Sequence, residues 1–390
     1  MLSTSDMTEL TWSDVPPLEM IDAEAAPGRG AHFDGRSFFN PGVPAGRGWF
    51  DLLRAALTAR PRPWPRFIEN TARAEPVTEV PVGRVVLTFV NHITFLIQLH
   101  GLNILTDPVY AERVSPLRHI GPRRVRAPGL AFADLPHIDL VLVSHDHYDH
   151  LDVETLRRLE AAHHPRFMTG LGNGKLLRRI GLREVHESDW WQQTALPAAT
   201  VTFTPAQHWS GRGLFRCNRS LWGGFHVRAA GAAVYFAGDT GYCRHFQDIR
   251  HRLGAVDVAL LPIGAYAPRW YEAPNHMNPE EAVRAHVQLE ARFSVATHFG
   301  CFRLSEEGFE EPLHELAAAR RAYGVPDNAF PALQTGETRH FEVTGREQVQ
   351  PVRAASVARQ FADAFEGRRM RVVKGAVETV GGERAGVAAV

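Results

Sequence analysis

The stretch VLVSHDHYDHLD, residues 141–152, constrains this chain more than any other feature of its sequence. An apolar run typical of a buried strand leads into four side chains of the kinds that bind metal ions. In an extended segment, residues i and i+2 point to the same side, so His145 and His147 can bind one ion while Asp149 and His150 turn toward a neighbouring site. A histidine-rich surface loop is the alternative, but closely spaced His and Asp are typical of metal sites. The loop therefore predicts a metal centre at a strand end.

Short runs of β-branched and apolar residues recur from Val82 onward. VVLTFV, TFLIQLH, AAVYFAGD and FSVATHFG predict strands, and they alternate with helical stretches such as VETLRRLEAA. In the stretch NPEEAVRAH, Asn278 is a plausible N-cap and Pro279 the first helical residue, so a helix is expected there. Strands and helices alternate in two similar halves, which favours the α/β class.

Three other predicted strands end in groups that match the loop. His208 follows TVTFTPAQ, Asp239 follows YFAG and His298 follows FSVAT, each about one supersecondary unit from the next. Taken singly, a histidine at a strand end is more often a satisfied structural group, and Asp before Thr-Gly can form an Asx-turn. Taken with the loop, we expect all three to be metal ligands, because strand ends form a rigid platform for ligands.

The loop and these later residues resemble the metallo-β-lactamase superfamily, whose four-layered αββα sandwich carries a two-metal site. The strings ESDWW, FTPAQHW, SLWGGFHV, FAGDTGYC and IGAYAPRWY narrow the resemblance to the phospholipases D that hydrolyse N-acyl-phosphatidylethanolamine. The likeness runs from about Phe33 to about Gly336. It implies two Zn²⁺ per chain, and a hydroxide bridging them that cleaves a phosphodiester of N-acyl-phosphatidylethanolamine-like lipids to give N-acylethanolamine and phosphatidate.

Carried over by motif position, the resemblance gives each zinc ion its own ligands. One ion takes His145, His147 and His208, the other takes Asp149, His150 and His298, and Asp239 bridges both. Two Zn²⁺, two aspartates and one hydroxide leave a charge of +1, which suits a phosphodiester of charge −1. His and Asp ligands without Cys suit zinc, with Mn²⁺ or Fe²⁺ as alternatives.

Further residues are expected around the ligands. The resemblance makes His276 catalytic together with Asp149, and His276 would assist the leaving alkoxide, although a surface histidine is the alternative. Asn275 stands where the family has Gln, and a contact with the head group there is left open. The remaining expected neighbours, behind the ligands or along the substrate pocket, are His92, Asp107, Tyr148 and Tyr266. For Asp107 a plain turn before Pro108, and for the tyrosines ordinary packing, are the alternatives.

Composition and flanking segments limit the class of protein. Lys and Arg number 43 and Asp and Glu 43, so the zero formal charge argues against a nucleic-acid binder. Three cysteines at unpatterned spacing favour a reducing compartment. Residues 1–80 are expected to form an irregular N-terminal arm with a short helix near FDLLRAALTA, residues 81–343 the hydrolase domain, and residues 344–390 a poorly ordered tail.

The chain shows neither a secretory signal nor an apolar run long enough to span a bilayer, so we expect a cytoplasmic protein whose membrane contact is peripheral. A homodimer is implied by the resemblance alone. Basic residues between Tyr110 and Pro128 indicate a solvated face, with attraction to lipid phosphate as the alternative. Trp190 and Trp191 fit either core packing or contact with a bilayer surface.

Other functions use the same donors. A metal-dependent lactone or amide hydrolase, and a phosphodiesterase for a small soluble substrate, would share the ligand set. A redox di-iron protein of this fold usually has Glu where His147 stands, and a non-catalytic lipid-binding module would not need every ligand position filled. A hydrolase acting on a phospholipid or another anionic diester is therefore favoured.

Overall fold

A computed structural model describes residues 20–21, 31–43, 49–117, 119–213 and 217–343. By its internal contacts the chain divides into Met1–Thr344 and Gly345–Val390, and the described residues all belong to the first unit. The predicted poor order of residues 344–390, and Arg118 of the basic run, lie outside the described residues.

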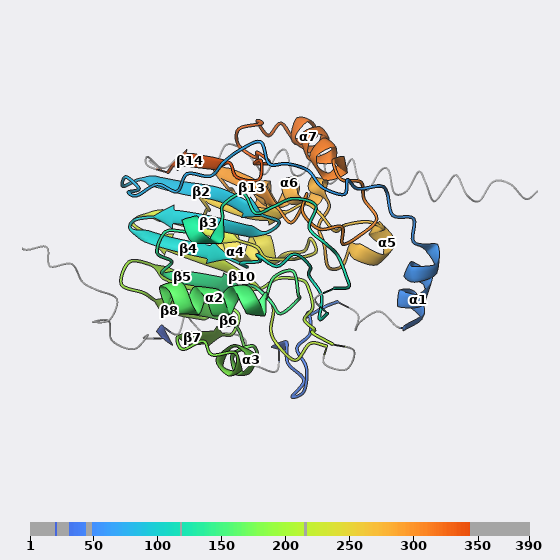
Figure 1. The fold of residues 1–390 in the computed structure, drawn as a ribbon, viewed down its shortest axis with the longest axis horizontal. Helices are drawn as coiled ribbons and strands as arrows, with labels where there is room; N and C mark the ends of the chain where they lie inside the picture. The colour runs from blue at the N-terminus through green and yellow to red at the C-terminus, as the bar shows by residue number, and fades with distance from the viewer. Residues whose placement is uncertain (1–19, 22–30, 44–48, 118, 214–216, 344–390) are drawn as a thin grey trace, which may run out of the picture. The chain divides into compact units, whose positions relative to one another are not determined.

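Two seven-stranded sheets form the centre of the described part of the chain (Figure 1). The first sheet has the spatial order β14 (Thr338–Glu342), β2 (Arg84–Asn91), β3 (Thr94–Leu99), β4 (Leu102–Thr106), β5 (Leu140–Val143), β6 (Arg166–Gly170) and β7 (Val185–Ser188). The second has the order β1 (Met20–Ile21), β8 (Gln193–Ala195), β9 (Thr200–Thr204), β10 (Gly224–Ala229), β11 (Ala232–Phe236), β12 (Val258–Pro262) and β13 (Phe293–Thr297).

Helices cover the outer faces of both sheets. Leu156 and Leu159 of α2 and Leu177 of α3 pack with Val141 and Phe167 of the first sheet in one apolar cluster. On the other side, α6 packs against β12 and α7 packs against α6. The helices are α1 (Trp49–Thr58), α2 (Val153–His163), α3 (Gly174–Arg179), α4 (His245–Leu253), α5 (Arg269–Glu272), α6 (Pro279–Gln288) and α7 (Glu311–Tyr323).

The main core lies between the sheets. Phe89 and Phe95 from the first sheet and Phe203, Phe225 and Phe236 from the second are fully buried in one cluster. Strands β2, β3 and β11 are buried on both faces, which explains why they read as nearly continuous apolar runs. The resulting order of helix, sheet, sheet and helix confirms the predicted αββα sandwich.

The helix predicted from NPEEAVRAH is confirmed with its cap. The Asn278 side chain accepts from the Glu281 backbone N–H at 2.8 Å, and the Glu281 side chain accepts from the Asn278 N–H at 3.0 Å, with Pro279 at the first position. This capping box satisfies two donors that a helix start leaves free. It fixes where α6 begins, directly after the turn that carries His276.

Part of the N-terminal arm contacts Asp189, His208 and Asn218. His32 Nε2 lies 2.7 Å from Asp189 Oδ1, both side chains being buried, and the Phe38 N–H donates to the Asn218 carbonyl at 2.8 Å. Asn40 Nδ2 donates to the carbonyl of His208 at 2.7 Å. The arm therefore supports the backbone of one of the predicted ligands.

Several surface expectations are decided by burial. Trp190 and Trp191 are 5% and 8% exposed and belong to the main core, which favours core packing over contact with a bilayer. The solvated face expected for the basic run is wrong for Arg124, which is 8% exposed and donates to the carbonyls of Val109 and Ala111. None of the helices in the described ranges combines the length and apolar character needed to cross a membrane.

Candidate metal centre

The predicted donors follow strands whose ends meet at one edge of the sandwich. Strands β4, β5 and β6 run parallel in the first sheet, and β11, β12 and β13 run parallel in the second. Residues 145–150 follow β5, and His208, Asp239 and His298 follow β9, β11 and β13. Because carboxyl ends of parallel strands share an edge, donors far apart in sequence come together there.

Three histidines form the first donor group. The Nε2 atom of His145 lies 2.8 Å from Nδ1 of His147, and Nε2 of His208 lies 3.3 Å from the same Nδ1. All three ring nitrogens fall within 4.8 Å of one another. We call His145, His147 and His208 the three-histidine group; its members come from both sheets.

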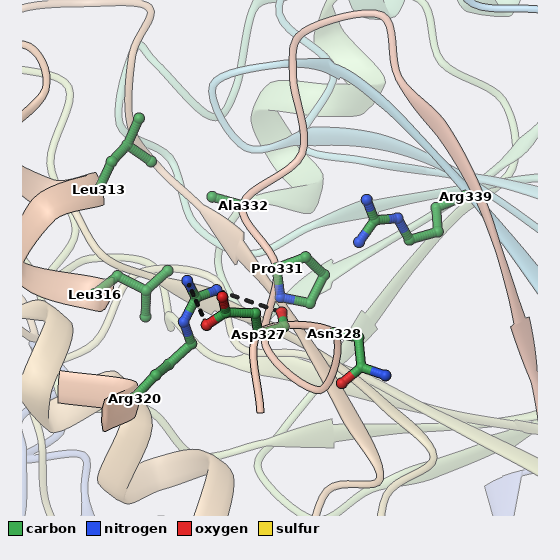
Figure 2. Close-up of a pocket in the computed structure, with 8 residues that line it drawn as sticks. All are labelled: Leu313, Leu316, Arg320, Asp327, Asn328, Pro331, Ala332 and Arg339. Atoms are coloured by element: carbon green, nitrogen blue, oxygen red, sulfur yellow. Dashed lines mark hydrogen bonds and ion pairs between the residues drawn. The ribbon is translucent and has the colours of Figure 1, made fainter. Parts of the chain in front are cut away.

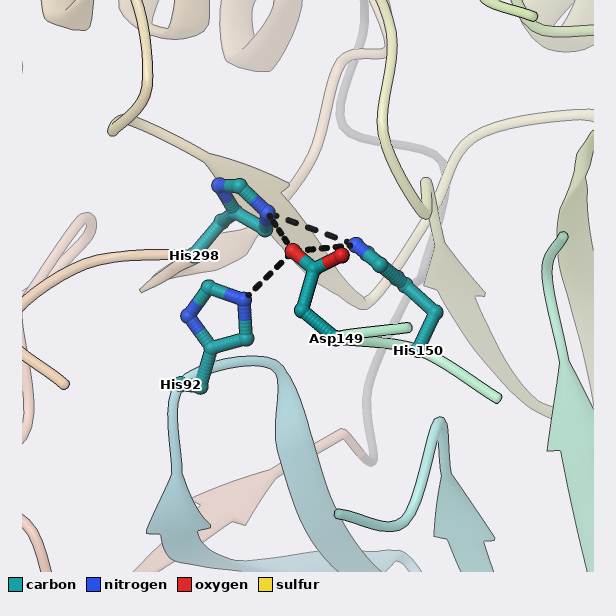
Figure 3. A group of neighbouring side chains, drawn as sticks. All are labelled: His92, Asp149, His150 and His298. Atoms are coloured by element: carbon teal, nitrogen blue, oxygen red, sulfur yellow. Dashed lines mark hydrogen bonds and ion pairs between the residues drawn. The ribbon is translucent and has the colours of Figure 1, made fainter. Parts of the chain in front are cut away.

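A second group contains a carboxylate (Figure 3). Asp149 Oδ2 lies 3.3 Å from Nε2 of both His150 and His298, and these two nitrogens are 3.3 Å apart. His92, on the turn between β2 and β3, places its Nε2 3.2 Å from the same carboxylate oxygen. We call Asp149, His150 and His298 the carboxylate group. His92 lies beside them, as expected of a neighbour.

Asp239 lies between the two groups. Its Oδ2 is 3.1 Å from His150 Nε2 and 3.2 Å from His298 Nε2, and 3.8 Å from His208 Nε2. Its Oδ1 is buried and has no hydrogen-bond partner. A buried carboxylate oxygen without a partner is costly unless a cation or a proton balances it.

The loop that carries Asp239 depends on a glycine. A Cβ atom built on Gly241 would lie 2.4 Å from the Pro274 carbonyl, so only glycine allows this approach without a shift of backbone. The Gly241 N–H donates to the carbonyl of Gln207, which precedes His208, at 2.8 Å. Gly241 therefore lets the loop of Asp239 contact both the segment before His208 and the segment before His276.

Asp107 supports two histidines from behind. Its Oδ2 lies 2.7 Å from His150 Nδ1 and accepts from the Ser144 hydroxyl at 2.5 Å. The Ser144 Oγ is in turn 2.9 Å from His145 Nδ1. These contacts fix the rings so that the Nε2 atoms face the centre, which is the arrangement that metal-bound histidines usually have. The structure thus favours the orienting role over a plain turn for Asp107.

His276 and Asn275 lie at the edge of the centre. His276 Nδ1 is 3.9 Å from Asp239 Oδ2 and has no hydrogen-bond partner, and the His276 ring stacks against that of His298 with centroids 5.6 Å apart. The backbone carbonyl of Asn275 lies 3.0 Å from His208 Nδ1. His276 therefore faces the donors, whereas the contact of Asn275 is made by its backbone.

The two predicted tyrosines contact other groups. The Tyr148 hydroxyl donates to the Arg212 carbonyl at 3.2 Å, and the Arg212 guanidinium lies 4.0 Å from the centroid of the Tyr148 ring. Tyr266 is 4% exposed, and burial together with nearby Glu315 raises the pKa of its hydroxyl. Their place along a substrate pocket stays a prediction.

The two groups differ in electrostatics. Burial lowers the pKa of His147 to about 3 and that of His208 to about 4, and it holds the pKa of His145 well below its usual range. Burial acts the same way on His298, but the charge of Asp239 and hydrogen bonds to Asp149 and Asp239 outweigh it and raise its pKa to about 9. The pKa of His150 is raised for the same reason.

The donors fit divalent metal ions. In the three-histidine group, ring nitrogens of uncharged imidazoles face one another at 2.8 and 3.3 Å, a placement that a shared cation would stabilise. The carboxylate group and Asp239 add two negative charges. Imidazole and carboxylate donors without thiolate suit Zn²⁺, Mn²⁺ or Fe²⁺.

Several residues that contact the donors could not be predicted from the sequence. Ser144, Trp209 and Asn40 each touch a donor residue, yet none belongs to a ligand pattern. Trp209 packs edge-on to His147 with centroids 4.2 Å apart and is 38% exposed. The one sequence feature that could have indicated Trp209 is its position directly after His208.

A cavity of about 440 Å³ lies away from this centre, between α7 and the turn before β14 (Figure 2). It is lined by Leu313, Leu316, Arg320, Asp327, Asn328, Pro331, Ala332 and Arg339. Arg320 pairs with Asp327 at 3.1 Å, and Arg339 pairs with Glu337 at 2.6 Å. This cavity contains none of the donors.

Comparison with known proteins places the centre in a family. The model of the β-lactamase superfamily domain matches residues 102–299, from β4 to the residue after His298. The chain belongs to the β-lactamase superfamily. It thus has the fold of this superfamily's metal-dependent hydrolases, with His and Asp clusters able to bind metal.

Two relatives and one solved structure show how similar this chain is to known proteins. An uncharacterised protein of Mycobacterium tuberculosis is 41% identical over 276 residues, covering 70% of this chain and 72% of that protein. N-acyl-phosphatidylethanolamine-hydrolysing phospholipase D 1 of Caenorhabditis elegans is 37% identical over 265 residues, covering 64% and 74%. The solved structure of Igni18, a metallo hydrolase of Ignicoccus hospitalis, matches with a TM-score of 0.50 and 25% identity, over 66% of this chain and 99% of that one.

Proposed function

We propose that this chain is a dinuclear zinc phosphodiesterase that hydrolyses N-acyl-phosphatidylethanolamine-like phospholipids to N-acylethanolamine and phosphatidate. The observation that carries the proposal is Asp239 Oδ2, which lies within 3.1–3.8 Å of histidine nitrogens from both donor groups. A shared carboxylate between two donor sets is the arrangement needed for two neighbouring cations.

The donor set suits an anionic diester. The three-histidine group would hold one Zn²⁺, the carboxylate group would hold the other, and Asp239 would contact both. When bound, the ions would supply hydroxide at neutral pH and offset negative charge on the phosphate. With two Zn²⁺, two aspartates and one hydroxide, the net charge of the centre would be +1, which would attract a phosphodiester of charge −1.

Individual side chains would do the rest. Asp149, held by His150, His298 and His92, keeps one carboxylate oxygen directed at the reacting centre. His276 faces the same space with an unpartnered Nδ1, so it can form a hydrogen bond to a phosphate or leaving oxygen. Both roles depend on where the two side chains lie. Their positions are fixed by the strand ends and by the close contact of Gly241 with the Pro274 carbonyl.

Support for a lipid comes from the relative and from the rim of the centre. The C. elegans protein is named for hydrolysis of N-acyl-phosphatidylethanolamine. Trp209, whose ring packs against His147, is 38% exposed at this edge. Exposed aromatic side chains suit contact with a lipid interface, so a peripheral membrane contact belongs to the proposal.

The test is release of phosphatidate from mixed vesicles of N-acyl-phosphatidylethanolamine and phosphatidylcholine by the purified, zinc-loaded chain. Phosphatidate and N-acylethanolamine are expected in equal amounts, and both should vanish with chelator and with Asp149→Asn. Asp248→Asn is the matched control, because Asp248 pairs with Arg244 on the surface of α4.

The rival functions are outcomes of the same assay. Turnover of a lactone, an amide or a small soluble phosphodiester, with no phosphatidate from vesicles, would overturn the lipid proposal while leaving the metal centre intact. Iron in the purified protein together with oxygen consumption would point to redox chemistry and contradict a hydrolase.

A further inference from the structure

Two side chains link the ligand loop to the segment that follows His208. From the loop, Asp146 Oδ1 accepts from the Gly211 N–H at 2.7 Å, and Asp146 Oδ2 accepts from the Ser220 hydroxyl at 3.0 Å. From the segment, Arg212 Nη1 donates to the carbonyls of Asp146 at 2.9 Å and Leu151 at 2.7 Å. We call Asp146 and Arg212 the cross-clamp.

The cross-clamp spans the ligand loop from Asp146 to Leu151. Its two carbonyl acceptors, on Asp146 and Leu151, bracket the residues that contribute His147, Asp149 and His150. One guanidinium nitrogen therefore joins the two ends of the loop. Its position is further fixed by the Tyr148 ring, which lies under the guanidinium at 4.0 Å and whose hydroxyl donates back to the Arg212 carbonyl.

The same contacts set the distance between loop and His208. Gly211, held by the Asp146 carboxylate, is three residues beyond His208, so the carboxylate fixes that segment against the loop. His147 Nδ1 and His208 Nε2 are 3.3 Å apart across this junction. The carboxylate group takes Asp149 and His150 from the same loop, but its third member, His298, follows β13 and does not depend on the junction with the His208 segment.

We propose that Asp146 and Arg212 are positioning residues that assemble the three-histidine group for its metal ion. Neither side chain is among the clustered donors, so both act through the backbone that carries His147 and His208. The inference rests on the metal centre proposed above but is independent of the substrate.

The test measures binding of Co²⁺ alone to the full chain, by chelator competition and by the visible absorption of bound Co²⁺. His208→Ala first identifies the absorption of the ion at the three-histidine group. In Arg212→Met and Asp146→Ala, the affinity for that ion should fall about 10- to 100-fold, as for partners that orient ligands. The affinity for the other ion should fall less, because its ligand His298 comes from outside the clamped segments.

Matched variants separate positioning from folding. Arg219→Met removes a guanidinium from the same segment, where Nη1 donates to the carbonyl of Arg36 at 2.7 Å, and it should leave both ions unchanged. Asp146→Asn keeps an acceptor for the Gly211 N–H and gains a donor for the Ser220 hydroxyl, and Arg212→Lys keeps a cationic donor. Both conservative variants should restore most of the lost affinity and should fold even if the others do not.

Wild-type affinity for both ions in Arg212→Met and Asp146→Ala would overturn the cross-clamp, as would equal loss of both ions in every variant including Arg219→Met. A wild-type chain that binds no Co²⁺ would instead overturn the metal centre itself, and the cross-clamp with it.

Discussion

The three-histidine group and the carboxylate group lie side by side but differ in charge. His145, His147 and His208 have lowered pKa values because they are buried, so without metal they are uncharged at neutral pH. His150 and His298 have raised pKa values because Asp149 and Asp239 lie against them. One half is therefore an uncharged set of ring nitrogens, and the other is already a balanced cluster of ions.

The difference shows what each half requires from a metal ion. In the carboxylate group, a metal must displace protons that the aspartates hold in place, whereas in the three-histidine group it meets imidazoles that carry no charge. Metal binding should depend most on ligand position in the three-histidine group, because no attraction between charges draws its side chains together.

The largest effect is expected from Asp239→Asn, because Asp239 is shared by both halves. Loss of one negative charge between the ions should lower kcat/KM on the phospholipid roughly 10³-fold or more, equivalent to about 4 kcal/mol. Metal analysis should show weaker binding at both groups, and Asp248→Asn should behave as wild type. Retention of both ions with full activity would contradict the shared role.

Removal of one histidine from either donor group should release the metal ion of that group alone. His208→Ala and His298→Ala are each expected to reduce the metal content from two ions to one and to weaken the affected ion by more than about 100-fold, beyond the range seen for groups that only orient ligands. Equilibrium dialysis with metal analysis measures this. If either variant lost both ions, the halves would be one cooperative unit and the comparison would fail.

A smaller effect is expected from Asp107→Asn. The amide can still bond to Ser144, but it no longer balances a protonated His150 or polarises its imidazole. Affinity at the carboxylate group should fall about 10- to 100-fold, with the three-histidine group less affected. Chelator competition distinguishes the two ions. An equal change in affinity for the two ions would indicate that Asp107 supports both donor groups to the same extent.

The two halves should also differ in how their metal affinity depends on pH. Since the pKa of His298 is raised to about 9, its ring is protonated below that pH, and affinity of the carboxylate group should rise with pH toward 9, by about tenfold per unit for each proton released. The pKa values of His147 and His208, about 3 and 4, predict no such rise between pH 6 and 8. Calorimetry in buffers of different ionisation enthalpy counts the protons.

Local sequence was sufficient for the strands that carry the donors and for the choice of ligand candidates. Apolar runs that end in His or Asp predicted β5, β9, β11 and β13, because a buried strand has a recognisable composition and its end is a fixed place in the fold. The cap at Asn278 was equally local. In contrast, the contact of Asp107 with His150 depends on how β4 and β5 pair, so the sequence left a plain turn open.

Long-range supports could not be predicted. Asn40 bonds to the His208 carbonyl across 168 positions, and Arg212 bonds to Asp146 across 66, and neither residue belongs to a ligand pattern. Burial of Trp190 and of Arg124 likewise depends on neighbours from distant segments. Such contacts follow from tertiary packing, which a single sequence does not reveal.

The placement of the donors at one edge of two facing sheets has a mechanical consequence. His145, His147, Asp149 and His150 extend from the first sheet, while His208, Asp239 and His298 extend from the second. Bound ions would hold the two sheets together at this edge, whereas apolar packing holds them together elsewhere. Without them, amide hydrogens near β5 and β13 should exchange with solvent sooner than those buried along β2 and β3, so the metal-free sandwich would begin to open at its catalytic edge.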